Sequence, residues 1–296
     1  MHIFLTGANG WIGSAVSRDL LAAGHRVTGL VRTPEKAALL AAAGVTPLLG
    51  AVGDLDVIRA GVGAADGIIH LAFGIDFSKI AEMAEEDTAA INAFGEVFAG
   101  SDRPIVVVGG FAVRPDVAKY TEDDRPAIIP EFPRASEQTA FQLAASGLRA
   151  SVVRLPRSVH GMGETHGFVP MLAQVARAKG FSAFVGDGAN QWPSVHRVDA
   201  ARVFRLALER GTGNEAYHAV AEEGIAYRDI AEAIGRQLGV PARSLTPDEA
   251  AAHFGPLAMW VAGNGPASSA HTRAVLGWSP REPGLIADIE RPDYSS

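Results

Sequence analysis

Three glycines near the N-terminus have the type and spacing to bind phosphate groups. Gly7, Gly10 and Gly13 follow a short apolar run at residues 3–5, which predicts a buried parallel strand. From Trp11 onward the apolar residues recur with a helical period, so the glycines join a strand to a helix. Glycines at such places allow a tight turn, close approach of a pyrophosphate, and close contact between helix and strand. Because free N–H groups at a helix N-terminus bind anions, we predict a dinucleotide site.

Arg32 adds a positive charge where the second predicted strand, residues 27–31, ends. In dinucleotide-binding folds an acidic residue near this point holds the ribose hydroxyls of NAD, whereas an arginine accommodates the 2′-phosphate of NADP. A guanidinium can hold such a phosphate with two parallel hydrogen bonds. The alternative is a solvated arginine at a strand end. We predict that Arg32 binds the phosphate and that the cofactor is NADP.

Apolar runs and helical repeats alternate along the first half of the chain. Further buried strands are predicted at 45–49, 67–72, 104–108 and 151–155, and the longest predicted helix spans 77–98. A capped helix is predicted to begin at Thr33, and a later helix and strand are predicted at 168–179 and 181–185. This rhythm predicts an α/β protein with a doubly wound parallel sheet of the Rossmann type. We assign residues 1–155 to the NADP-binding Rossmann domain, with a return segment near 195–222. Residues 156–296 are assigned mainly to a smaller C-terminal substrate-binding domain.

Composition excludes several classes of protein. The 296 residues include no cysteine, which removes disulfides, thiolate metal sites and thiol nucleophiles. The net charge of −7 argues against a general nucleic-acid binder. No apolar run reaches the length of a membrane span, and no leader precedes the first strand, so we expect a cytoplasmic protein. The nine histidines lack an HExxH-like spacing, so no metal site is predicted.

With these elements laid out, the chain resembles the extended type of the short-chain dehydrogenase/reductase superfamily over nearly its full length. The segments that carry the resemblance are residues 6–13, 66–72, 152–156, 195–199 and 276–280. It implies a Rossmann domain for the cofactor and a smaller C-terminal domain for a small-molecule substrate. It also implies that the cofactor contacts come from Gly7, Asn9, Gly10, Trp11, Ile12, Gly13, Leu71, Ala72, Phe73, Pro156 and Val159.

The usual catalytic residues of that superfamily are replaced. Relatives use a tyrosine four residues before a lysine, with a serine and an asparagine upstream. Here Pro133 and Glu137 occupy the tyrosine and lysine places, Gly109 the serine place, and Asp87 the asparagine place. The chain is therefore identified as an atypical member, and the usual mechanism of the superfamily does not carry over to it.

Two other residues are candidates for catalysis. Tyr120 lies in a long loop expected above the sheet, where its phenol could protonate a developing alkoxide or amide. Asp76 follows the fourth predicted strand and could reach the substrate end of the pocket. Each has a structural alternative, which is the more common use of such a residue. Tyr120 could be a packing residue, and Asp76 could cap the helix at 77–98.

Five residues are candidates for contacts with the substrate. His160 follows the segment implied to line the nicotinamide, and His196 precedes the return to the sheet; both could donate hydrogen bonds near neutral pH. Phe111, Phe168 and Trp192 fall at predicted loop ends and could form an apolar pocket. The alternatives are structural histidines with satisfied hydrogen bonds and aromatic rings that pack in the core.

These features together predict an NADPH-dependent reductase of small, fairly apolar C=O or C=N compounds, either a ketoreductase or an imine reductase. Most of its chemistry would be positioning, because the cofactor supplies the reaction. The alternative is a non-catalytic NADPH-binding sensor or partner module, since loss of all four usual residues is what that function predicts. A sugar-nucleotide epimerase is disfavoured by the missing tyrosine and lysine.

The missing tyrosine also bears on the type of substrate. Reduction of a ketone places a negative charge on oxygen and needs a nearby acid, which contributes about 10²–10⁴-fold to the rate. An iminium is already positive, so its reduction removes charge and needs no acid at that moment. We therefore expect cyclic imines to be reduced faster than matched cyclic ketones, with activated carbonyls as the ketones that compete.

A homodimer is the last expectation. In relatives, the helix at 77–98 and the helix that begins near Arg134 pair across a two-fold axis. Alanines at 81, 84, 89 and 93 would allow close approach of two helices. The alternative is that these alanines pack on the sheet of their own chain.

Overall fold

The computed structural model describes residues 1–296 apart from 74–78, 112–117, 126–127, 129–132, 292–293 and 295–296. Its centre is a seven-stranded parallel sheet in the order β10-β6-β5-β4-β1-β2-β3. The strands are β1 (His2–Thr6), β2 (Arg26–Val31), β3 (Thr46–Leu49), β4 (Gly67–His70), β5 (Ile105–Gly110), β6 (Ala150–Leu155) and β10 (Ala216–His218). The strand order reverses between β1 and β4, which is the arrangement of a doubly wound sheet. The predicted Rossmann-type fold is confirmed.

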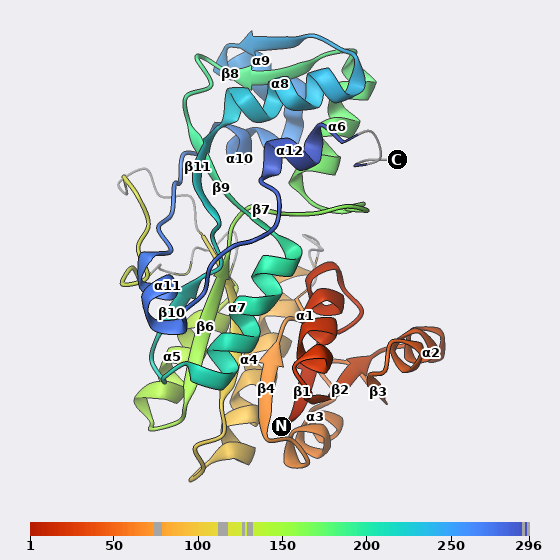
Figure 1. The fold of residues 1–296 in the computed structure, drawn as a ribbon, viewed down its shortest axis with the longest axis vertical. Helices are drawn as coiled ribbons and strands as arrows, with labels where there is room; N and C mark the ends of the chain where they lie inside the picture. The colour runs from red at the N-terminus through yellow and green to blue at the C-terminus, as the bar shows by residue number, and fades with distance from the viewer. Residues whose placement is uncertain (74–78, 112–117, 126–127, 129–132, 292–293, 295–296) are drawn as a thin grey trace.

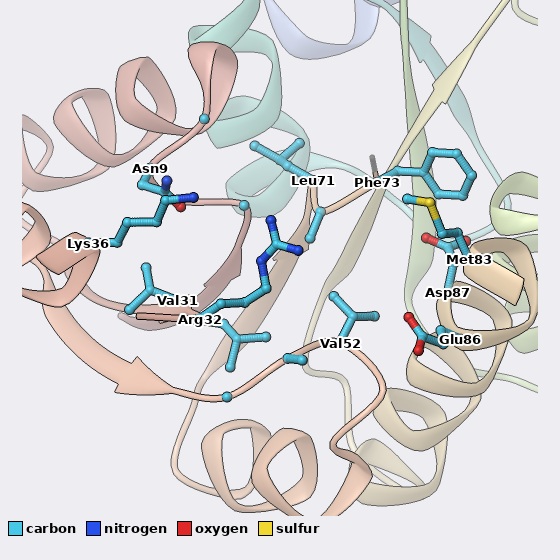
Figure 2. Close-up of a pocket in the computed structure, with 16 residues that line it drawn as sticks. Asn9, Val31, Arg32, Lys36, Val52, Leu71, Phe73, Met83, Glu86 and Asp87 are labelled. Carbon is cyan, nitrogen blue, oxygen red and sulfur yellow. The ribbon is translucent and has the colours of Figure 1, made fainter. Parts of the chain in front are cut away.

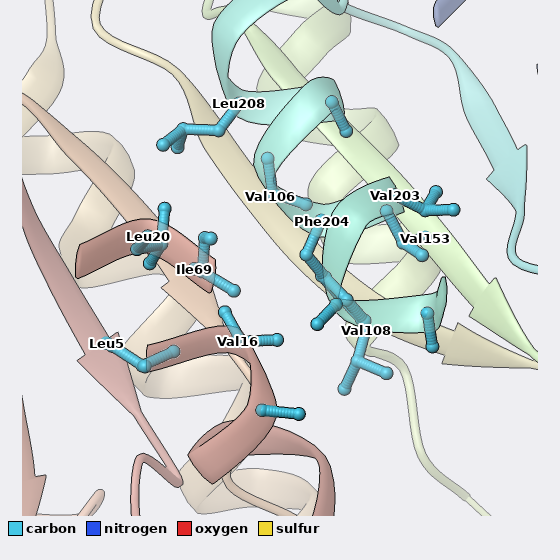
Figure 3. Packing of buried hydrophobic residues seen from close by; sticks show 14 of the residues in the cluster. Leu5, Val16, Leu20, Ile69, Val106, Val108, Val153, Val203, Phe204 and Leu208 are labelled. Atoms are coloured by element: carbon cyan, nitrogen blue, oxygen red, sulfur yellow. The ribbon is translucent and has the colours of Figure 1, made fainter. Parts of the chain in front are cut away.

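Helices cover both faces of the sheet (Figure 1). On one face α1 (Trp11–Ala22) packs beside α7 (Arg197–Arg210), and on the other lie α3 (Leu55–Gly63), α4 (Ile80–Phe98) and α5 (Ser136–Ala145). Figure 3 shows Val16 of α1 and Phe204 of α7 against strand residues such as Val106. Because both faces are covered, the central strands are apolar along nearly their whole length.

Local signals in the sequence set several element boundaries. The helix α2 (Pro34–Ala42) begins after Thr33, whose hydroxyl accepts a hydrogen bond from the Lys36 N–H. Proline at the first helical position adds a preset φ angle. The helix predicted at 168–179 is present with the same bounds as α6 (Phe168–Lys179). The predicted return to the sheet is also present, because β10 follows α7 and pairs in parallel with β6.

A second apolar core lies beyond the carboxyl ends of the central strands, at the top of Figure 1. A three-stranded sheet and a two-stranded sheet frame it, and the sequence predicted only one of their five strands, β8. The strands are β7 (Ser158–His160), β9 (Gln191–His196), β11 (Glu222–Ala226), β8 (Ser182–Val185) and β12 (Ala242–Leu245). The helical elements are α6, α8 (Tyr227–Leu238), α9 (Pro247–Phe254), η1 (Gly255–Leu257), α10 (Ala258–Ala262) and α12 (Leu285–Ile289), and α11 (Ala270–Leu276) packs back against α7.

Membrane insertion through a helix finds no support in the described part of the chain. None of the helices there combines the length and the apolar composition that crossing a bilayer requires.

Candidate functional site

A cavity of about 350 Å³ lies at the carboxyl ends of β1, β2, β3 and β4. Figure 2 shows Arg32 and Lys36 on one side of it and Phe73, Met83 and Asp87 on the other. The lining residues are Gly7, Asn9, Gly10, Leu30, Val31, Arg32, Lys36, Gly50, Ala51, Val52, Leu71, Ala72, Phe73, Met83, Glu86 and Asp87. In open α/β sheets this edge, next to the reversal of strand order, is where ligands bind.

The glycine-rich loop forms the floor of the cavity. Gly7 has φ +70°, a left-handed conformation, and a Cβ there would lie 3.0 Å from the Ala72 nitrogen. A Cβ on Gly13 would lie 2.0 Å from the Gly7 carbonyl oxygen, so helix α1 can approach the loop only with glycine at this place. The Gly10 N–H donates to the Gly7 carbonyl at 2.9 Å and closes the turn. The loop therefore has the compact shape that a bound pyrophosphate requires.

Thr6 fixes the opposite wall of the cavity. Its Oγ1 accepts hydrogen bonds from the N–H groups of Leu71 and Ala72, both at 3.1 Å. With both lone pairs used, the Thr6 hydroxyl donates its proton to Nδ1 of His70 at 2.8 Å. His70 therefore carries its proton on Nε2, which donates to Asp87 Oδ1 at 2.9 Å. This connection ties the wall at Leu71 to helix α4.

The two cations come from the end of β2 and the first turn of α2. Arg32 directly follows β2, and Lys36 lies four residues later, beyond the Thr33 cap. Both line the cavity, while the acidic residues among the described lining, Glu86 and Asp87, come from α4. One end of the cavity is thus positive and suited to a phosphate.

Asp87, at the asparagine place of the superfamily, is buried in a hydrogen-bond network. It accepts from His70 and, at 2.5 Å, from the Ser136 hydroxyl, and Ser136 accepts from Arg134 Nε at 2.6 Å. Burial alone would raise the pKa of Asp87, but these hydrogen bonds and the charge of Arg134 outweigh it and lower the pKa. Asp87 is therefore a carboxylate at neutral pH.

Glu137, at the lysine place, forms a buried ion pair with Arg154, whose Nη2 donates to Oε1 at 2.6 Å. Arg154 Nη1 donates to Nε2 of His218 at 3.0 Å, and His218 Nδ1–H donates to the Ser268 carbonyl at 2.7 Å. Burial and the charge of Arg154 lower the pKa of His218 to about 3, so its ring is neutral. The side chain that replaces the usual lysine is therefore engaged inside the protein.

The sequence pattern of an NAD(P)H-binding family matches residues 7–179. The chain belongs to this family. It is 46% identical to an uncharacterised protein of Schizosaccharomyces pombe over 295 residues, which cover 99% of this chain and 100% of that protein. It is 30% identical to the 4-hydroxy-2-methyl-3-oxo-4-farnesyl-3,4-dihydroquinoline-1-oxide ketoreductase of Stigmatella aurantiaca over 229 residues, 73% of this chain and 67% of the relative.

The fold is also that of solved structures in the extended short-chain dehydrogenase/reductase superfamily. The crystal structure of DesIV, a dTDP-glucose 4,6-dehydratase from Streptomyces venezuelae with NAD and TYD bound, superposes with a TM-score of 0.77. The superposition covers 99% of this chain and 95% of that chain at 20% identity. Together with the family match over residues 7–179, this fold confirms the predicted superfamily, and the chain is an NAD(P)-binding protein of the oxidoreductase and epimerase type.

Most predicted cofactor contacts of this NAD(P)H-binding protein lie at the cavity or beside it. The predicted contacts that line the cavity are Gly7, Asn9, Gly10, Arg32, Leu71, Ala72 and Phe73. Trp11, Ile12 and Gly13 form the first turn of α1, and the Trp11 indole N–H donates to the Val159 carbonyl at 2.7 Å. That hydrogen bond connects the glycine-rich loop to the segment that runs from Pro156 through β7. The contacts themselves stay predictions.

Tyr120 and Phe111 lie together in a smaller apolar cluster. Tyr120 is 2% exposed, and its backbone N–H donates to the Pro266 carbonyl at 2.8 Å. The ring of Phe111 contacts Tyr120 at 5.4 Å and His218 at 4.7 Å between centroids. Tyr120 thus has the packing surroundings that the structural alternative expects. Asp76, the other predicted catalytic residue, lies outside the described residues.

His160 and His196 form a pair around Asp288. His160 is 1% exposed, and its Nδ1 lies 2.6 Å from Asp288 Oδ2. His196 lies 3.8 Å from the same oxygen through Nε2, and its Nδ1 accepts from the Val198 N–H at the start of α7. Burial and the neighbouring His160 lower the pKa of His196. Both histidines therefore have structural partners, and their role in substrate binding stays a prediction.

Phe168 and Trp192 meet in the second core. Their ring centroids are 5.5 Å apart, and Phe168 also contacts Trp260 at 5.7 Å. Trp192 is fully buried, whereas Phe168 and Trp260 remain partly exposed. Of the two predicted residues, Phe168 therefore offers surface to a ligand in this structure.

Sequence reasoning missed several residues that line the cavity, among them Lys36, Met83 and Glu86. Lys36 could have been found, because it lies one helical turn after Arg32 in a helix whose cap was recognised. Met83 and Glu86 lie one turn and one residue before Asp87 on α4. They had no signal of their own, since the face of α4 that meets the cavity is set by its packing against α3 and α5.

Proposed function

We propose that the protein is an NADPH-dependent reductase of small, fairly apolar substrates with a C=O or C=N bond. The observation that carries the cofactor choice is the pair of cations, Arg32 and Lys36, that line one end of the cavity. An arginine fork binds phosphate oxygens bidentately, and a lysine adds a point charge. NADH has no 2′-phosphate, so with NADH both cations would have no partner there.

The remainder of the site supports positioning rather than side-chain catalysis. A bound nicotinamide cofactor supplies the hydride. Gly7 and Gly13 allow close approach of the backbone to a pyrophosphate, and Thr6 holds the wall at Leu71 in place. The chain therefore binds and orients the reactants, which alone can account for a large part of a rate enhancement. The ketoreductase relative from Stigmatella supports reduction as the reaction.

The substrate preference follows from the residue at the tyrosine place. Pro133 has no ionisable proton to give to a developing alkoxide, and Glu137 is paired with Arg154. Asp87 lines the cavity as a carboxylate, and by Coulomb attraction a negative wall favours a cation over an oxyanion. An iminium suits a site that has no acid and a negative wall, because it is positive before reduction and neutral after it. Imines are therefore the preferred class, with activated carbonyls next.

The experiment is a turnover assay with the purified protein. NADPH or NADH is supplied with one imine or one activated ketone, and oxidation of the cofactor is followed by its absorbance. The expected result is turnover with NADPH and much slower turnover with NADH at equal concentrations. Turnover that is faster with NADH would contradict the cofactor assignment.

One observation favours the non-catalytic alternative, an NADPH-binding sensor or partner module. Asp87 and Glu137, at two of the four usual catalytic places, are both engaged in internal networks. Tight binding of NADPH without turnover of any imine or ketone in the same assay would support this alternative and exclude the reductase.

We also propose that the protein is a homodimer through α4 and α5. Ala84 and Ala93 are buried within the chain, as the alternative for these two alanines expects, whereas Ala81 and Ala89 reach the surface of α4. Light scattering at micromolar concentration should give twice the mass of one chain, which is 30.9 kDa. The mass of one chain would exclude the dimer.

A further inference from the structure

Arg157 lies just beyond the carboxyl end of β6, between the central sheet and the second core. It follows Pro156 and precedes β7, the strand that the Trp11 indole ties to the glycine-rich loop. Its guanidinium carbon lies 5.5 Å from the ring centroid of Trp192 and 5.8 Å from that of Trp260. This edge of an open α/β sheet is where ligands bind, so Arg157 stands on the substrate side of the fold.

The charge of Arg157 is not balanced by the part of the chain that the structure describes. Its Nη1 donates to the Gly263 carbonyl at 2.9 Å, but no described carboxylate lies within ion-pair distance. Its Nε is buried and has no hydrogen-bond partner among the described residues. Burial lowers the pKa of Arg157 to about 10, so the group still carries its charge at neutral pH. An unpaired buried donor on a charged group is costly and needs an explanation.

The buried Arg154 shows what is missing. Its partner is Glu137, whose carboxylate accepts from Nε and Nη2 of the guanidinium. At Arg157 the Nε–Nη2 edge, which is the pair of donors that holds a carboxylate with two parallel bonds, has no partner within the described residues.

The surroundings of Arg157 have the shape of a small binding site. A Cβ on Gly263 would lie 3.2 Å from Nη2, and a Cβ on Gly265 would lie 3.5 Å from it, so the backbone there approaches the guanidinium closely. Phe168 and Trp260 are partly exposed and in contact with each other, and Trp260 also faces Arg157. A charged fork therefore lies next to an apolar aromatic surface.

We propose that Arg157 binds a carboxylate group of the substrate and that Phe168 and Trp260 contact the apolar part of the same molecule. The inference rests on the proposed reductase function and narrows its substrate class to oxo or imino compounds that carry a carboxylate. Arg157 is then a residue that determines specificity, and the reducible bond lies elsewhere in the substrate.

A binding experiment tests this without turnover. The protein saturated with NADP⁺ is titrated with phenylacetate and with phenylacetamide, its neutral analogue, and tryptophan fluorescence is followed because Trp192 and Trp260 flank the site. The wild type should bind phenylacetate at least about tenfold more tightly than the amide, as expected when a charge-assisted pair forms. Arg157→Met should remove this difference, and Arg157→Lys should keep part of it. Equal affinities in the wild type, or a preference that survives Arg157→Met, would overturn the proposal.

Two further variants serve as controls for this binding experiment. Arg157→Gln keeps a donor for the Gly263 carbonyl without the charge, so it should behave like Arg157→Met even if the methionine variant folds poorly. Arg243→Met removes an exposed arginine that also faces an aromatic ring, Phe181, and should change neither affinity. A loss of NADPH affinity in Arg157→Gln would mean that Arg157 serves a phosphate of the cofactor, which would also overturn the proposal.

Turnover separates this inference from the proposed function. With NADPH, phenylpyruvate and its methyl ester form a matched pair of activated carbonyls. Arg157→Gln should lower kcat/KM for the acid at least tenfold and leave the ester unchanged. Turnover of both at equal kcat/KM in the wild type would refute the role of Arg157 and retain the reductase. No turnover of either, with selective binding of phenylacetate intact, would refute the reductase and retain the carboxylate site.

Discussion

The cofactor side of the cavity and the catalytic places of the superfamily differ in how far they keep the expected residues. The glycines at 7, 10 and 13 are present, and their geometry leaves space only for glycine at Gly13. At the catalytic places, in contrast, Asp87 and Glu137 have new partners inside the protein. The first region depends on backbone shape, which tolerates little change, whereas the second depends on a few side chains that can be exchanged once neighbours satisfy them.

The largest expected effect is on the catalytic side. Glu137→Ala would leave Arg154 charged and buried without its carboxylate, and should lower the free energy of unfolding by about 3–5 kcal/mol. Glu96→Ala, which removes an exposed ion pair with Arg59, is the control and should cost about 0–1 kcal/mol. Urea unfolding measures both. A stable Glu137→Ala that has lost only its activity would make Glu137 catalytic rather than structural, and the contrast between the two regions would fail.

The next prediction concerns Asp87 and has a pH signature. Asp87→Asn loses two charge-assisted hydrogen bonds and should cost about 1.5–3 kcal/mol at pH 7. Because the folded pKa of Asp87 is lowered, the stability that it contributes is fully present above its unfolded value of 3.8 and is lost as the pH falls through the folded value. The difference in the free energy of unfolding between wild type and Asp87→Asn should therefore become smaller as the pH falls below 3.8. A difference that becomes larger below pH 3.8 would show that Asp87 is protonated in the folded protein.

On the cofactor side, Arg32→Ala should weaken NADPH binding by about 1.5–3 kcal/mol, or about 10–150-fold. Lys36→Ala should have a smaller effect in the same direction, because a lysine acts as a point charge. The matched control is Arg26→Ala, at the exposed opposite end of β2. Fluorescence titration with NADPH and NADH measures the affinity of each variant for both cofactors. If Arg32→Ala weakens both cofactors equally, Arg32 does not contact the 2′-phosphate.

The smallest effect is expected at Tyr120. Its ring is buried against Phe111, and packing explains it without a role in proton transfer. Tyr120→Phe should therefore change kcat/KM for an imine by less than about threefold, against the 10²–10⁴-fold that a general acid contributes. Loss of ketone reduction by that larger factor would show that Tyr120 replaces the missing acid.

The sequence was a good guide to the fold of the first half and a poor one to the second. Strands such as β4 and β5 are buried on both faces and read as continuous apolar runs, and helices such as α2 carry recognisable caps. The strands β7, β9, β11 and β12 were not predicted. They are short or carry polar residues, as Glu222–Ala226 does, and their pairing is set by distant partners rather than by local pattern.

The site could be predicted where the backbone creates it. The glycines, Arg32 and Leu71 lie at strand ends, and a parallel sheet brings such ends together. His160 and His196 show the limit of prediction from sequence, because only the fold reveals that they share Asp288. Arg157 shows this limit most clearly. Its type and position were in the sequence, but an unpaired charge is a property of the surroundings and not of the residue.

The most direct test of the central claim compares one cyclic imine with one cyclic ketone of the same ring size and substituent, each reduced by the wild type with NADPH. Pro133 offers no acid for an alkoxide, whereas an iminium needs none at the moment of reduction. We expect kcat/KM for the imine to be at least about tenfold higher, since a lost general acid removes about 10²–10⁴-fold from the rate of ketone reduction. A ketone that is reduced as fast as its matched imine would contradict this expectation.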